Sequence, residues 1–117
     1  MSTVAQTRSR HKAEKSALAT AQKAQKKTLD NVWKGELKTV LFARKEAITR
    51  LTTGSGWAQK SAAQKSAEKG AFVRSYASNI ASVKTSAKTA KSALSAQMKG
   101  ARASMSARHK SEMASVR

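Results

Sequence analysis

The side chains that could perform acid–base or metal chemistry are few and scattered in this sequence. Cysteine is absent, and the two histidines are His11 and His109. His11 and Glu14 are three residues apart, so on a helix they would share a face and could hold a proton or a metal ion together. Two ligands at the frayed start of a helix make a weak site, and a surface pair is the preferred interpretation. His109, between Arg108 and Lys110, is interpreted as one more cation-capable residue in a basic cluster.

Motifs for nucleophilic catalysis and phosphate transfer are missing as well. No serine lies in a nucleophile-elbow pattern, and the sequence has no Walker-type phosphate loop. The segment Gly54-Ser55-Gly56 is interpreted as an interhelical turn. Carboxylates such as Asp30, Glu46 and Glu68 have Lys or Arg three or four residues away, as surface helix pairs do. We therefore expect a protein that is not an enzyme and that uses no cofactor and no metal.

The strongest signal in the composition is positive charge. The chain of 117 residues carries 24 Lys and Arg against six Asp and Glu, a formal net charge of +18. The charge is spread over both halves, because counting these residues gives +8 in 1–56 and +10 in 57–117. Such a charge opposes compaction by self-repulsion, so we expect an anionic partner. Nucleic acid, DNA or RNA, is the preferred partner, and an acidic protein surface is the alternative.

A stripe of basic residues follows the second half of the chain at helical spacing. Because no Asp or Glu occurs between Gly70 and Ser111, we expect this stripe to lack an internal counter-charge and to be available to an external polyanion. Lysine outnumbers arginine and no base-reading pattern is present, which favours phosphate contacts without sequence specificity. The predicted nucleic-acid-binding residues are Lys84, Lys88, Lys91, Lys99, Arg102, Arg108, Lys110, Arg8, Arg10 and Lys12.

The elements that must position these residues are helices. Proline is absent and Ala, Lys, Gln, Ser and Arg dominate, which predicts an all-α protein. Two glycines next to hydroxyl side chains can supply the positive φ of a helix stop and predict a turn at 53–56. The fold is therefore predicted to be a long antiparallel helical hairpin with coiled-coil-like packing, and we expect it to be oligomeric, with copies packed side by side. Its expected parts are a basic arm or frayed helix start at 1–15, a first helical arm at 16–52, the turn at 53–56 and a second arm at 57–117.

Local signals refine these helices. Thr3 with Gln6, and Ser61 with Gln64, fit the capping-box pattern at helix starts. Gly35, shortly after the capping pair Asp30-Asn31, allows a bend near residues 30–36.

Apolar residues recur in steps of three and four and define a packing seam. Besides the larger apolar residues listed below, many positions of this seam are alanine. Alanine buries little apolar area in each contact layer, so we expect copies of the chain to pack together. The aromatic rings gather toward the turn, where the main core is expected. No fixed-length internal repeat is evident. The predicted seam consists of Leu29, Trp33, Leu37, Val40, Leu51, Phe72, Tyr76, Ile80, Val83, Leu94 and Met98.

The predicted function is a non-enzymatic, self-assembling structural protein that neutralises nucleic acid, as in a nucleoid, a ribonucleoprotein or the interior of a virus particle. The alternative is a scaffold or virion component that binds an acidic protein surface. A less favoured alternative is an amphipathic helix on anionic lipid, which would need a bulkier apolar face. No apolar run approaches the roughly 20 residues of a membrane-spanning helix. With no secretion signal, an intracellular or intravirion location is expected.

Overall fold

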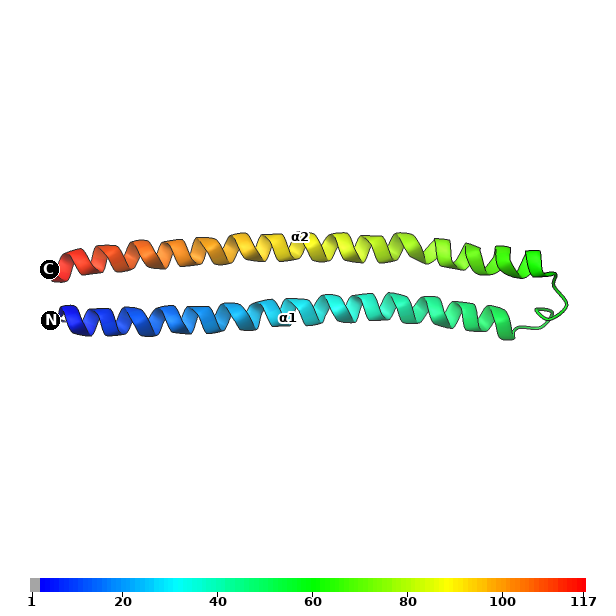
Figure 1. The fold of residues 1–117 in the computed structure, drawn as a ribbon, viewed down its shortest axis with the longest axis horizontal. Helices are drawn as coiled ribbons and strands as arrows, with labels where there is room; N and C mark the ends of the chain where they lie inside the picture. The colour runs from blue at the N-terminus through cyan, green and yellow to red at the C-terminus, as the bar shows by residue number, and fades with distance from the viewer. Residues whose placement is uncertain (1–2) are drawn as a thin grey trace. The chain divides into compact units, whose positions relative to one another are not determined.

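The computed structural model describes residues 3–117 and consists of two long helices (Figure 1). Helix α1 covers Val4–Thr53 and helix α2 covers Ala62–Val116, with 50 and 55 residues. The two helices pack against each other as an antiparallel hairpin. The prediction of an all-α helical hairpin is confirmed.

Both helices begin with the predicted capping boxes. The Gln6 backbone N–H donates to Thr3 Oγ1 at 3.1 Å, and the Thr3 N–H donates to Gln6 Oε1 at 2.9 Å. Ser61 and Gln64 repeat this exchange at 3.1 and 3.0 Å. Each box satisfies backbone N–H groups that have no partner inside the helix, which fixes where the helix starts.

The N-terminal segment is an ordered part of α1. The expected basic arm or frayed start covered residues 1–15, of which the first two lie outside the described residues. From Val4 the chain is helical, and the helix is continuous through 30–36, where the sequence allowed a bend. Thr7 and His11 are buried, whereas the sequence suggested that this segment had little to pack against. The C-terminal part of α2 supplies the missing surface.

The connection between the helices covers 54–61, which is longer than the predicted turn at 53–56. Helix α2 begins at Ala62 because Ser61 is its capping residue, so the segment from Trp57 to Lys60 belongs to the connection and not to the second arm. Gly56 has a φ of 84°, the left-handed conformation that was expected of a glycine in this turn.

The hairpin divides into two compact units. The terminal unit combines residues 3–30 with Ala90–Arg117, and the turn unit is Asn31–Thr89. Within the described part of the chain, every buried residue lies in the terminal unit: Thr7, His11, Gln22, Met98 and His109. The expectation of a main core at the turn end is therefore wrong. Packed between only two helices, large rings such as Trp33 and Tyr76 keep part of their surface exposed, whereas the smaller Thr7 side chain is covered.

The predicted seam residues lie on the facing sides of the helices without forming a deep core. Met98 is buried and the other ten are partly buried. Within residues 3–117, three large apolar side chains are exposed, Val32, Phe42 and Val73, and Phe42 is the most exposed of them at 64%. Among residues 3–117, no helix has the length and apolar character needed to cross a membrane.

Candidate functional site

The same short motif occurs near both ends of the chain, and the fold brings the two copies together. Residues 10–14 read Arg-His-Lys-Ala-Glu and residues 108–112 read Arg-His-Lys-Ser-Glu. The first lies on α1 and the second on α2, on opposite sides of the seam of the terminal unit. We call this paired arrangement the histidine clasp.

The two imidazole rings form the centre of the clasp. The His11 and His109 rings stack with centroids 3.7 Å apart and an interplanar angle of 10°. Both residues are buried, with 6% and 5% of their surface exposed. His11 Nε2 lies 2.8 Å from Glu112 Oε2, and His109 Nε2 lies 3.1 Å from Glu14 Oε2. Because an ionised carboxylate can only accept, each Nε2 must carry the hydrogen.

The carboxylates complete the clasp with the two arginines of the motif. Arg10 donates to Glu112 and Arg108 donates to Glu14 across the seam. Within each helix, Arg10 Nε lies 3.6 Å from Glu14 and Arg108 Nη1 lies 3.3 Å from Glu112. The hydrogen bond from His109, followed by that from Arg108, lowers the pKa of Glu14. The hydrogen bond from His11, with the charge of Arg10, lowers the pKa of Glu112.

This arrangement corrects the sequence interpretation of both histidines. His11 was interpreted as the partner of Glu14 in a surface pair, and His109 as one more residue in a basic cluster. Each histidine instead bonds the glutamate of the opposite helix and is buried. The repeated motif was the signal that could have revealed the clasp, although no fixed-length repeat had been recognised.

A cationic hollow adjoins the clasp. It has a volume of about 430 Å³, and five basic side chains and both histidines contribute to its wall. None of the described residues that line it is acidic. His109 lines it, and His109 Nδ1 has no hydrogen-bond partner among residues 3–117. The basic lining residues are Arg8, Lys12, Lys15, Lys110 and Arg117.

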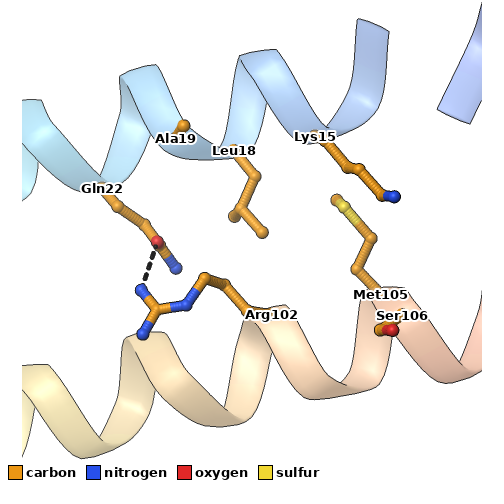
Figure 2. A pocket seen from close by; sticks show the side chains of 7 residues that line it. All are labelled: Lys15, Leu18, Ala19, Gln22, Arg102, Met105 and Ser106. Carbon is orange, nitrogen blue, oxygen red and sulfur yellow. Dashed lines mark hydrogen bonds between the residues drawn. The ribbon is translucent and has the colours of Figure 1, made fainter. Parts of the chain in front are cut away.

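A second hollow continues the first along the seam, because both are lined by Lys15 and Ser106. Its volume is about 300 Å³, and Leu18 and Met105 give it an apolar wall (Figure 2). Buried Gln22 closes it from α1 by donating to the Met98 carbonyl at 3.0 Å. The Gln22 carbonyl oxygen in turn accepts from Arg102 Nη1 at 3.0 Å, as the dashed line in Figure 2 marks.

A third hollow of about 190 Å³ lies farther from the chain ends, between residues 26–30 and 91–98. Here Lys91 Nζ pairs with Asp30 Oδ1 at 3.0 Å. We call these three hollows of the terminal unit together the cationic groove; both helices contribute basic side chains to it, and Asp30 is the one acid among the described residues that line it.

The predicted nucleic-acid-binding residues separate into three groups. Five of them line the groove: Arg8, Lys12, Lys91, Arg102 and Lys110. Two, Arg10 and Arg108, belong to the clasp. Three are exposed and line none of these hollows: Lys84, Lys88 and Lys99.

The expectation that basic residues between Gly70 and Ser111 have no counter-charge within the chain is wrong for two of them. Lys91 pairs with Asp30, and Arg108 pairs with Glu14 and Glu112. The acids come from the opposite helix or from beyond Ser111, so the absence of acids inside the segment did not predict the pairing. Lys15 and Arg117 line the groove but were not among the predicted contacts.

The basic side chains around the hollow beside the clasp are suited to binding anions. Within the described part of the chain, no cluster of three or more His, Asp and Glu residues is arranged to hold a metal ion. Lysine and arginine donors that converge without an acid between them suit phosphate oxygens. Comparisons with known proteins found no matching family model, no similar curated protein and no similar solved structure.

Proposed function

We propose that this chain is a non-enzymatic structural protein that binds and neutralises nucleic acid through phosphate contacts, and that packs with copies of itself on the polyanion. The observation that carries the proposal is the cationic hollow beside the clasp, where five basic side chains converge and no described lining residue is acidic. Side chains arranged in this way repel one another, so an anion bound between them relieves an unfavourable interaction.

The charge balance of the terminal unit supports the same function. Residues 1–30 and 90–117 contain 13 Lys and Arg and three acids, which gives a net charge of +10. All three acids form ion pairs across the seam. The groove residues Arg8, Lys12 and Lys110 are exposed and form no ion pair within residues 3–117, so they are available to phosphates.

The groove also favours contacts without sequence specificity. Its polar lining is mostly Lys and Arg on long, flexible stems, which follow a phosphate backbone without reading base edges. The residues on α1 that line it run from Arg8 to Asp30, and at a rise of 1.5 Å per residue this is about 33 Å of helix. One strand of a B-form duplex presents a phosphate about every 3.4 Å, so several phosphates can lie along such a length.

The thin interior supports the assembly part of the proposal. Met98 is the single buried hydrophobic side chain among residues 3–117. Exposed apolar side chains such as Phe42 provide further apolar surface for contacts between copies. Neutralisation by a polyanion would remove the repulsion that otherwise keeps such basic chains apart.

The test is to purify the protein at low salt and again at high salt, and to measure light scattering and the ratio of absorbance at 260 and 280 nm. We expect nucleic acid to co-purify at low salt and to be released at high salt, because phosphate contacts weaken as salt rises. A nucleic-acid-free oligomer at both salt concentrations would overturn the proposal and favour an acidic protein surface as the partner.

A further inference from the structure

The histidine clasp is self-complementary. Every contact that the α1 motif makes with the α2 motif is returned in the opposite direction. Arg10 donates to Glu112 as Arg108 donates to Glu14, and His11 bonds Glu112 as His109 bonds Glu14. The Arg-Glu contacts within each helix are also equivalent, and the rings stack on each other. The contacts therefore have the reciprocity of a two-fold arrangement, although the two helices differ in sequence.

Reciprocal contacts of this kind are the property of an isologous interface, in which one surface binds a second copy of itself. Any antiparallel helix that presents Arg-His-x-x-Glu offers the same donors and acceptors as the chain's own opposite helix. The chain carries this motif at both ends. A second copy therefore presents two segments that match each half of the clasp.

We infer that the histidine clasp joins two copies of this chain, with the motif on α1 of one copy clasped by the motif on α2 of the other. In this exchanged dimer, other contacts between α1 and α2 also re-form between the two copies. They include the hydrogen bond from Gln22 to the Met98 carbonyl and the ion pair of Asp30 with Lys91. The product is a dimer with two equivalent clasps, one at each exchanged pair of chain ends.

The motif on α1 can be clasped by the α2 motif of its own chain or by that of a second copy, and the protein concentration decides between the two. The contacts are the same in both cases, so the balance is set by the effective concentration of the chain's own end, which is on the order of millimolar for short flexible linkers. Crowding of copies along a polyanion would raise the local concentration of the second copy's ends and so favour exchange. In this respect the inference rests on the self-assembly part of the proposed function and names the contact that performs it.

The experiment uses two full-length variants with complementary motifs. The acidic variant combines Arg10→Glu with Arg108→Glu, and the basic variant combines Glu14→Arg with Glu112→Arg. Each variant alone places like charges on both sides of the clasp, so neither closes it within a chain or with its own copies. A mixture restores opposite charges, but only between an acidic and a basic copy. The buffer contains a chelator, because the acidic variant gathers carboxylates and imidazoles that would attract metal ions.

A matched control pair carries the same charges outside the terminal unit. Each substitution changes the net charge by two, so the acidic variant has a net charge of +14 and the basic variant +22. Lys34→Glu with Lys38→Glu, and Glu36→Arg with Glu46→Arg, give the same two values from positions in the turn unit. Both members of each mixture remain strongly positive, so attraction between unlike net charges cannot produce association.

Native mass spectrometry and light scattering, without nucleic acid, measure the mass of the species in each mixture. We expect a 1:1 mixed dimer and a gain in helical circular dichroism only when the acidic and basic variants are combined, and no mixed species in the control mixture. If the mixture contains only separate monomers, the inference is overturned. If no mixed dimer forms but the wild-type protein still assembles on nucleic acid, the proposed function stands and the copies assemble through another surface. Mixed dimers from a protein that binds no nucleic acid would instead support the clasp and overturn the proposed function.

Discussion

Replacing three groove cations should change the salt dependence of nucleic-acid binding by a calculable amount. The variant is Arg8→Gln, Lys12→Gln and Lys110→Gln, which removes three exposed charges from the wall of the hollow beside the clasp. Each phosphate contact contributes about 0.9 to the slope of log K against log salt on a duplex. Loss of three contacts therefore lowers the magnitude of the slope by about 2.7.

The same slope difference fixes how the variant compares with the wild type as salt is raised. Between about 50 and about 200 mM salt, a slope difference of 2.7 reduces the affinity advantage of the wild type by about 40-fold. Fluorescence anisotropy with a labelled duplex of mixed sequence, measured at several salt concentrations, gives both slopes. A second duplex of unrelated sequence should show the same affinities, because phosphate contacts carry no sequence information.

A control with equal loss of charge separates the groove from the net charge. Lys34→Gln, Lys38→Gln and Lys45→Gln remove three exposed charges from the turn unit. We expect this control to keep most of the wild-type slope. Equal slopes for the two triple variants would refute the reasoning, because binding would then follow the total charge of the chain and not the groove.

Three further predictions concern stability. The pKa values of Glu14 and Glu112 are lowered from 4.5 by the clasp, so their contribution is present above that pH and is lost as pH falls through the folded-state values. Thermal unfolding should show this acid loss in the wild type and not in a Glu14→Gln, Glu112→Gln variant, and equal acid loss in both would contradict it. Gln22→Leu removes two cross-helix hydrogen bonds and should lower the free energy of unfolding in urea by about 1 to 3 kcal/mol; no change would show that these bonds contribute nothing. Gly56→Ala should cost about 1 kcal/mol because of its positive φ, whereas Gly35→Ala, in open space within α1, should add about 1 kcal/mol. Effects of the same sign for the two glycines would be inconsistent with these backbone conformations.

The sequence predicted those features that depend on neighbouring residues. Capping boxes need two side chains three residues apart, and Thr3 with Gln6 satisfies this within one turn. The turn depends on glycines that are close in the chain, and Gly56 adopts the expected conformation. The exact start of α2 differed because Ser61, and not the last glycine, caps the helix. Such local chemistry can be evaluated without knowing the fold.

The features that sequence analysis missed depend on the register between the helices. His11 meets His109 only when the hairpin is closed with those residues opposite each other. Apolar spacing in an alanine-rich seam fixes this register weakly, because a shift replaces one small side chain with another. Polar groups that must find each other's hydrogen-bond partners discriminate between registers more sharply. The repeated motif therefore contains register information that the hydrophobic pattern lacks.

The separation of the charged residues into paired and unpaired ones connects the fold to the proposed function. The terminal unit has three acids, and each pairs with a basic residue of the opposite helix: Glu14 with Arg108, Asp30 with Lys91, and Glu112 with Arg10. Ten of its 13 basic residues then form no ion pair among residues 3–117. Glu14 and Glu112 hold the helices together at the clasp and line none of the three hollows, and Asp30 neutralises Lys91 alone, so most of the groove keeps its positive charge. A chain that placed more acids along the groove would lose the charge that attracts phosphates.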